Sequence, residues 1–250
     1  MTRIADMTGE ELQQVLDLVR GADSVELKLT VVEDRRHEVT RVLGIDPMNA
    51  QIRQVFFFDT KDLKLNESGV VVRARRRQND TGDSVVKIRP VDPGDLSEDL
   101  RADPEFGVEV DAMPGGYVCS ASFKGSADNT AIKDAAVGEM KLRKLFSKRQ
   151  RAFFAEHAPE GVEIDDLDVL GPIPTLRVKF GSDGYDRPMV GELWLYPDGS
   201  QVVELSTKAS PSEAFQAALE WRAFLQTRGI DISGEQQTKT KTALEFFTRS

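Results

Sequence analysis

The sequence predicts an α+β fold in which eight antiparallel strands close into a barrel and helices pack outside it. Three observations support this prediction. About eight segments alternate between charged and apolar residues, as β-strands with two different faces do. The apolar positions are rich in Val, Leu, Ile and Phe, and segments with helical periodicity are available to cover them. If the sheet closes, its charged faces meet in a wet, ionic lumen.

The first half of the chain supplies two helices and five strands. A helix is predicted over about 8–20, where Thr8 stands at the N-cap position and apolar residues recur at helical spacing. A second helix is expected over about 33–44. Strands are expected over 24–32, 54–60, 69–78, 84–90 and 106–113.

The second half completes the barrel. One packing helix is expected over about 129–148, from its stripe of apolar residues. A strand is expected over 174–180, and a Pro-Asp-Gly turn divides 190–209 into a hairpin of two strands. Helices are expected over about 211–227 and, near the tunnel, about 238–248. We see no long linker or low-complexity tract, so the chain is predicted to be one domain, 1–250.

Composition narrows the classes of function and site. The chain has 33 Lys and Arg against 42 Asp and Glu, and a net charge of -9 disfavours nucleic acid or an anionic membrane as its main partner. No apolar run has membrane-spanning or signal-peptide length, so we expect a cytoplasmic protein. With one cysteine, Cys119, and two histidines, a metal would be held by carboxylates, which favour Mg²⁺ or Mn²⁺.

The segment "GVVVRARRRQ" places Arg73, Arg75 and Arg77 on one face of a strand. Taken alone, such a run is most simply a solvated basic face. The pattern recurs in "SVVKIRP" and "PTLRVKF", however, and burying so many cations without partners is costly. A closed lumen must therefore stay hydrated, pair its charges internally, or bind a strongly anionic ligand with metal ions.

The ordered segments "VELK", "VFFFDTKDLKLNESGVVVRARRR", "VVKIRP", "VEV", "LRVKF", "VVELSTK" and "TKTKTALE" resemble the CYTH superfamily, the triphosphate tunnel metalloenzymes. The resemblance spans residues 24–246. It implies an enzyme that binds a triphosphate, or a compound bearing one, in a cationic tunnel and hydrolyses it with Mg²⁺ or Mn²⁺. Which triphosphate is the substrate, and whether the protein is oligomeric, stay open.

The resemblance also implies roles for particular residues. Glu26, Lys28 and Glu204 are the expected catalytic residues, and Glu26, Glu192 and Glu204 the expected metal ligands. The expected phosphate-binding residues are Lys28, Arg73, Arg75, Lys87, Arg89, Arg177 and Lys179. Glu109 and Asp111 are supplementary acids. In the terminal segment, Lys239 or Lys241 is expected near the phosphates.

Two serines depart from the family pattern. Ser24 and Ser206 stand where the family has acids, and a lumen with fewer acids should hold metal more weakly. The alternative is therefore a noncatalytic module that binds triphosphate or inorganic polyphosphate. A nucleic-acid binder using "RARRR" is disfavoured by the acidic composition and by the absence of interleaved aromatic residues. For each cation, a structural salt bridge is the competing role.

Overall fold

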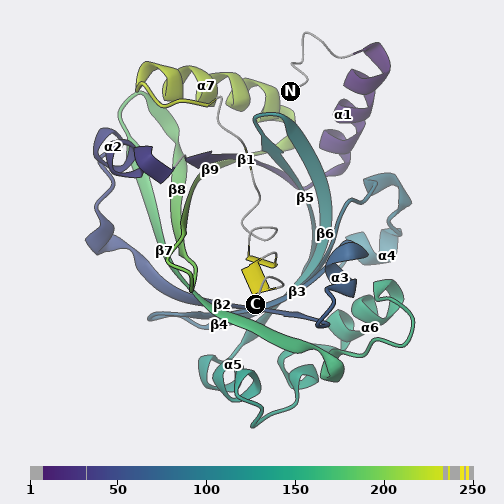
Figure 1. Cartoon of the computed structure of the whole chain (residues 1–250). Coiled ribbons are helices and arrows are strands. Elements are labelled where there is room, and N and C mark those ends of the chain that lie inside the picture. Colours follow the sequence, from purple (N-terminus) through teal and green to yellow (C-terminus); the bar gives the residue numbers. More distant parts are fainter. Residues whose placement is uncertain (1–7, 32, 233–235, 237–242, 245, 248–250) are drawn as a thin grey trace.

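The computed structural model describes residues 8–31, 33–232, 236, 243–244 and 246–247. Nine strands form one closed barrel, and helices pack around it (Figure 1). The strands are β1 Ser24–Val31, β2 Gln51–Asp59, β3 Val70–Arg77, β4 Gly82–Ile88, β5 Phe106–Met113, β6 Gly116–Ala127, β7 Asp168–Ser182, β8 Tyr185–Leu195 and β9 Gln201–Ala209. Their order around the barrel is β1-β5-β6-β4-β3-β2-β7-β8-β9.

The barrel is mixed, because β1 and β5 run parallel while the other neighbouring pairs in the described sheet are antiparallel. Directions can alternate all the way round a closed ring only when the number of strands is even. A nine-stranded ring must contain a parallel pair. The prediction of eight strands, all antiparallel, is therefore wrong in both respects, although the predicted closed barrel is confirmed.

The strand that the sequence analysis missed is β6. Its outward positions, Tyr117, Cys119, Ala121 and Phe123, do alternate, but small residues occupy most of the positions between them. Such a pattern has little hydrophobic contrast, so it is a weak signal for a strand. β6 nevertheless pairs along its length with both β4 and β5, and closure of the barrel depends on it.

The helices cover the outside of the barrel (Figure 1). The α-helices are α1 Gly9–Gly21, α2 Arg36–Val42, α3 Lys64–Glu67, α4 Glu98–Arg101, α5 Asn129–Ala136, α6 Lys148–His157 and α7 Ala214–Thr227. Helices close to those expected over 8–20, 33–44 and 211–227 are present. The single helix expected over 129–148 is wrong: the chain turns at Gly138, whose φ of 80° is left-handed, and α6 begins afresh after the N-cap Ser147.

The main core lies between the barrel and these helices. On β1 the residues Val25, Leu27, Leu29 and Val31 are buried on the outer face, as the alternation predicts. They join a continuous apolar cluster with residues of α5, α6 and α7. Because this outer layer supplies most of the hydrophobic stabilisation, the opposite faces of the strands can carry charged side chains, together with a second, smaller apolar cluster.

Asp59 shapes the connection between β2 and β3. Its buried carboxylate accepts hydrogen bonds from the backbone N–H groups of Thr60, Leu65 and Asn66, at 2.7, 2.9 and 3.0 Å. These bonds hold the short helix α3 against the end of β2 and return the chain into β3. The aspartate in "FFFDT" therefore has a structural role here.

No helix among the described residues combines the length and apolarity needed to cross a membrane.

Candidate functional site

A cavity of about 390 Å³ occupies the lumen of the barrel. Among the described residues, eleven cationic and five acidic side chains line it, a formal excess of six positive charges in a chain of net charge -9. The cations are Lys28, Arg53, Arg73, Arg75, Arg77, Lys87, Arg89, Lys124, Arg177, Lys179 and Lys208. The acids are Glu26, Glu109, Asp111, Glu192 and Glu204.

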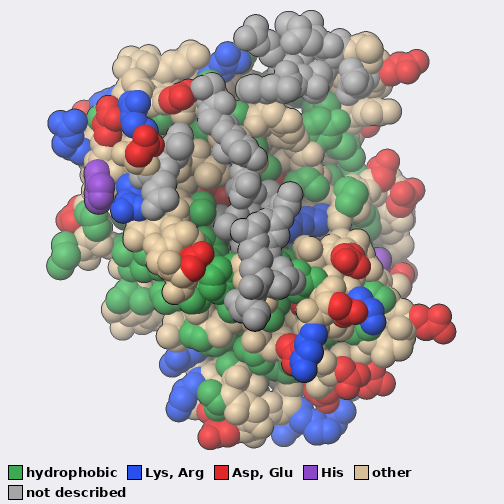
Figure 2. All heavy atoms as spheres, viewed as in Figure 1, with side chains coloured by type: hydrophobic (Ala, Val, Ile, Leu, Met, Phe, Trp, Pro, Cys, Tyr) green, Lys and Arg blue, Asp and Glu red, His purple; other side chains and the backbone are tan. Residues whose placement is uncertain are grey.

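The part of the outer surface that Figure 2 shows does not share this concentration of positive charge. On the face seen in Figure 2, Lys and Arg side chains are interspersed with Asp and Glu over the outer elements. A polyanion would therefore be attracted to the lumen rather than to the part of the outer surface that Figure 2 shows.

Every residue predicted for catalysis, phosphate binding or metal binding lines this one cavity. The structure thus brings together side chains from β1, β3, β4, β7, β8 and β9 and from the segment just after β4. Their roles stay predictions. The sequence analysis did not include Arg53, Lys124 or Lys208 among the site residues, and it noted Arg77 only as a neighbour of the expected pair.

Signals for these further residues were present but weak. Lys124 lies on the unpredicted strand β6, and Arg53 lies just before the expected start of β2. Lys208 shares the inner face of β9 with Glu204 and Ser206, which is visible in the alternation of "VVELSTKA". Once the strand bounds are known, period-two alternation is enough to find all three.

At one part of the lumen lies a lysine–carboxylate cluster, formed by Glu26, Lys28, Glu109, Asp111 and Lys208. Lys28 Nζ lies 2.7 Å from Asp111 Oδ1 and 3.3 Å from Glu26 Oε2. Lys208 Nζ, on β9, contacts Glu109 Oε2, on β5, across the intervening strand β1. The strand register accounts for the cluster, because Glu26 pairs with Asp111 on one side and with Lys208 on the other.

These contacts decide the charge states of the cluster. Burial disfavours the charged form of Lys28, but the carboxylates of Asp111, Glu26 and Glu204 outweigh it and raise its pKa. For Glu109, burial opposes ionisation, yet Lys208 and Lys87 lower its pKa to about 2. Lys28 and Glu109 are therefore charged at neutral pH, and their contacts pair positive with negative groups within the cluster.

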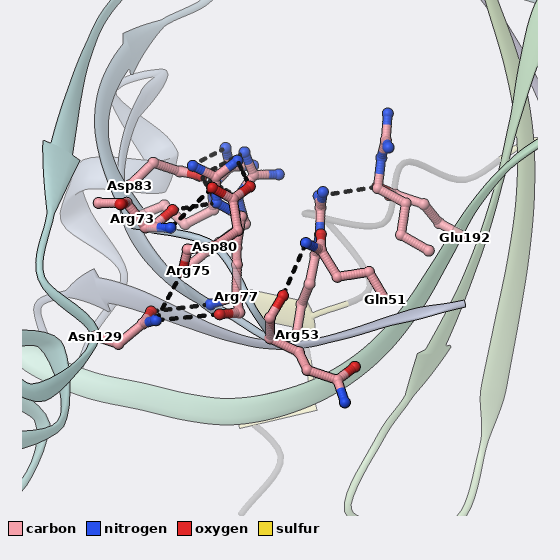
Figure 3. Close-up of polar contacts among 12 residues, drawn as sticks. Gln51, Arg53, Arg73, Arg75, Arg77, Asp80, Asp83, Asn129 and Glu192 are labelled. Atoms are coloured by element: carbon pink, nitrogen blue, oxygen red, sulfur yellow. Dashed lines mark hydrogen bonds and ion pairs between the residues drawn. The ribbon is translucent and has the colours of Figure 1, made fainter. Parts of the chain in front are cut away.

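An arginine cluster occupies another part of the lumen and consists of Arg53, Arg73, Arg75, Arg77 and Arg177. It comes from β2, β3 and β7, and Figure 3 shows Arg73 and Arg75 beside Asp83, and Arg53 between Gln51 and Glu192. Two acids lie among the five arginines. Glu192 Oε1 is 3.8 Å from Arg53 Nη1 and 3.4 Å from Arg177 Nε. Asp83 contacts Arg73, Arg75 and Arg77 of β3.

The arginine cluster has unused hydrogen-bonding capacity. The buried Nε of Arg73 has no hydrogen-bond partner among the described residues. Burial, and then the charge of Arg75, lowers the pKa of Arg73 to about 10, and burial with Arg75 and Arg177 lowers that of Arg53 to about 10 as well. Both stay protonated at neutral pH. An unpaired buried donor is costly, so this cluster favours an anionic ligand.

Lys87 interacts electrostatically with residues of both clusters. Burial lowers its pKa to about 8, which the carboxylates of Asp111 and Glu109 only partly oppose, and Lys28 and Arg73 lower it further. Lys87 is thus the lumen cation for which the structure gives a pKa closest to neutrality.

Three of the lumen acids are close enough together to bind a hard divalent cation. Within the described part of the chain, Glu26, Glu109 and Asp111 each offer a carboxylate oxygen, and these atoms lie within 4.8 Å of one another. This donor set suits Mg²⁺ or Mn²⁺. Of the predicted ligands, Glu26 belongs to this group, while Glu192 and Glu204 are directly opposite each other on β8 and β9.

The two serines occupy the predicted family positions without charge. Ser24 Oγ donates a hydrogen bond to Glu109 Oε2 at 3.3 Å. Ser206 is buried in the lumen wall and pairs with Lys28 across β1 and β9. Neither serine adds a carboxylate to the group around Glu26.

The C-terminal segment packs against the barrel next to the cavity. Ala243 and Leu244 are buried in an apolar cluster that includes Val71 and Trp194, and both of these also line the cavity. In Figure 1 the described residues 243–244 and 246–247, drawn in yellow, lie within the outline of the barrel. Lys239 and Lys241 lie outside the described residues, so their predicted approach to the phosphates stays a prediction.

Comparisons with known proteins bear on the fold. No family model and no curated protein matches the sequence. Among solved structures, the chain is similar to a provisionally assigned adenylate cyclase from Bacillus halodurans, with a TM-score of 0.60, 13% identity, and coverage of 88% of this chain and 97% of that one. It is also similar to HpAC1 from Hippeastrum, with a TM-score of 0.63 and 17% identity over 88% and 95% of the two chains.

HpAC1 is described as an adenylyl cyclase candidate with a dominant triphosphatase activity. At these identities the likeness shows the fold alone. That fold is consistent with the barrel expected from the CYTH resemblance, and membership of the family stays a prediction.

Proposed function

We propose that this protein binds a linear triphosphate, or a compound that carries one, in the barrel lumen and hydrolyses it with the help of Mg²⁺ or Mn²⁺. The observation that carries the proposal is the gathering of eleven cations in one cavity of an acidic chain. The triphosphatase activity described for HpAC1, which has a similar fold, supports the same class of reaction.

The arginine cluster suits the binding of phosphate groups. Guanidinium groups are planar and can donate two parallel hydrogen bonds to phosphate oxygens, and they stay charged when buried. Arg73 contributes a donor that has no partner among the described residues, and Arg89, Lys124 and Lys179 extend the cationic wall. A triphosphate would thus replace water around these groups with charge-assisted hydrogen bonds.

The carboxylates of Glu26, Glu109 and Asp111 would hold the metal ion, with Glu204 on the adjacent strand β9 and Glu192 on β8 as the other predicted ligands. A bound Mg²⁺ or Mn²⁺ would polarise a phosphoryl oxygen and neutralise developing charge. Lys28 and Lys208 neutralise these acids in the structure, so metal binding requires that the two lysines give up part of their contacts. The released ammonium groups would then be available to phosphate oxygens.

The residues of the chain would serve mainly to position and stabilise the reacting groups. Phosphoryl transfer requires an aligned nucleophile and cations around the nonbridging oxygens, with little covalent participation from the protein. Lys28, Lys87 and Arg73 would stabilise the charge, and Glu192 or Glu204 would orient the attacking water. The reaction breaks a phosphoanhydride bond and gives orthophosphate and the shortened phosphate compound.

A noncatalytic triphosphate-binding module is the second candidate. It is favoured by the acidic group itself, since the lysine–carboxylate cluster is already neutralised by two ammonium groups and lacks acids at Ser24 and Ser206. Such a protein would bind the anion but would not need metal. The two candidates share the phosphate-binding cavity and differ in turnover.

The test is a phosphate-release screen on the purified protein with Mg²⁺ or Mn²⁺. The substrates are tripolyphosphate, thiamine triphosphate and nucleoside triphosphates, with cyclic AMP measured for ATP. Calorimetry with tripolyphosphate in EDTA measures binding separately. The matched variants are Arg177→Gln in the lumen and Arg187→Gln, whose guanidinium contacts Glu213 and Glu220 outside the barrel.

We expect metal-dependent release of phosphate that Arg177→Gln weakens and Arg187→Gln leaves unchanged. Binding without release under any of these conditions would favour the noncatalytic module. Absence of both binding and release would overturn both candidates.

A further inference from the structure

Asp83 is an acid that faces β3, the strand that contributes most cations to the cavity wall. It lies on β4, next to the β3–β4 turn, and its Cα pairs with that of Arg75. The side chain is 14% exposed. Alternation along β4 places Asp83 on the same face as Val85 and Lys87, but Asp83 was not predicted as a site residue, and the predicted phosphate-binding role of Arg75 does not account for it.

The carboxylate of Asp83 forms a close ion pair with Arg75 and also approaches two further arginines. Arg75 Nε lies 3.0 and 3.1 Å from the two carboxylate oxygens, and its Nη2 donates to Oδ2 at 2.9 Å. Arg77 Nε and Arg73 Nη2 approach the same carboxylate at 3.7 and 4.0 Å. The bidentate edge of Arg75, which would bind a phosphate best, is therefore already occupied.

Asp83 is a fixed negative charge. Burial opposes its ionisation, but Arg75, Arg73 and Arg77 outweigh this effect and hold its pKa below the usual range. Figure 3 shows Asp83 beside the side chains of Arg73 and Arg75. Any phosphate reaching Arg75 and Arg77 must compete with this carboxylate.

Arg73 differs from its two neighbours on β3. Its Nε has no partner among the described residues, and its contact with Asp83 is the longest of the three. Arg73 is thus the arginine of β3 most available to a ligand, while the next cations toward the turn are held by an internal anion.

We propose that Asp83 is a specificity-determining residue. It prevents phosphate groups from binding beyond Arg73, toward the β3–β4 turn, and so restricts the ligand to short linear polyphosphates. The inference rests on the proposed binding of triphosphate in the lumen and adds the length of chain that the site accepts. A longer chain gains little beyond Arg73, because its next phosphate meets arginines already paired and a carboxylate of like charge.

The experiment compares Asp83→Asn with Asp80→Asn. The first change keeps the size of the side chain and removes its charge. The second removes the charge of an acid that contacts Arg77 at 3.1 Å but whose side chain, at the turn, is 46% exposed. Calorimetry in EDTA measures the affinity for tripolyphosphate, tetrapolyphosphate and a long-chain polyphosphate, with the last expressed per chain end.

We expect the wild-type protein to bind the long chain about tenfold more weakly than tripolyphosphate, and Asp83→Asn to close most of that gap. Asp80→Asn should leave the gap within about twofold of the wild type, since exposed charges are screened. Circular dichroism verifies that each variant is folded. Should Asp83→Asn fail to fold, the wild-type series of three chain lengths decides alone.

Equal wild-type affinities for the short and long chains would overturn the inference. A gap that Asp83→Asn leaves unchanged would also overturn it, while triphosphate binding itself would stand. If the wild-type protein binds none of the three polyphosphates, the proposed function fails together with the inference.

Discussion

Replacement of Lys28 by Met should destabilise the protein through the two acids that it would leave behind. The ammonium group lies 2.7 Å from Asp111 and 3.3 Å from Glu26, and its side chain is 15% exposed. Methionine fills a similar volume but carries no charge. The carboxylates would then face each other in the lumen wall without the cation that neutralises them.

The magnitude follows from these distances. At an effective dielectric constant of about 20, the two contacts correspond to roughly 6 and 5 kcal/mol of gross attraction. Desolvation of the buried ammonium offsets much of this, and removal of one partner from a buried ion pair costs about 3–5 kcal/mol. We therefore expect the free energy of unfolding to fall by about 3 kcal/mol, which for a chain of this size lowers Tm by about 6–12 °C.

Urea denaturation followed by circular dichroism measures the loss. The control is Lys64→Met, because Lys64 contacts Asp62 at 3.2 Å while both side chains are more than half exposed. Such a surface pair contributes about 0–1 kcal/mol. Mg²⁺ or Mn²⁺ should restore part of the stability of Lys28→Met, since the unpaired acids would accept the cation. A loss no larger than that of Lys64→Met would refute the reasoning.

Three further outcomes are expected. Glu204→Gln should reduce metal-dependent phosphate release at least about tenfold while changing tripolyphosphate affinity in EDTA by less than about threefold; equal losses in kinetics and calorimetry would contradict a metal role. Arg73→Gln should weaken that affinity about tenfold, whereas Arg187→Gln should not; equal affinities would argue against phosphate contact. Because Lys87 has a pKa of about 8, its charge is present below that pH and lost above it. Calorimetric affinity should therefore fall as pH rises through about 8, and Lys87→Met should flatten this dependence; an unchanged profile would exclude Lys87 as its source.

The sequence by itself determined which residues of most strands face the lumen. Alternation in period two is a local property of an extended backbone, so Lys28, Arg73, Lys87 and Arg177 could be assigned to one face from neighbouring residues alone. The closed barrel followed from the same pattern, since the apolar faces needed helices outside and the charged faces needed water or a ligand inside. The resemblance of the ordered motifs then suggested triphosphate chemistry.

Sequence patterns were the weakest predictors of strands whose two faces differ little in hydrophobicity. β6 carries Ser120, Ser122 and Lys124 toward the lumen side and small residues on much of its outer side, so its alternation was missed. The break after α5 depends on Gly138, a residue that a helix can tolerate and that only the left-handed backbone shows to be a terminus. Because β6 makes the number of strands odd, the closed ring must contain a parallel pair, and in this structure the pair is β1 with β5.

Only the tertiary structure decided which charges meet. Lys208 and Glu109 are 99 residues apart, and their contact depends on the registers of β9 and β5 with β1 between them. The register of the β3–β4 hairpin likewise places Asp83 opposite Arg75. A register shift of one residue would turn each side chain to the other face, yet no single segment encodes the register of a closed ring. Alternation therefore identified the inward charges, while closure of the barrel determined which of them neutralise one another and which stay available to a ligand.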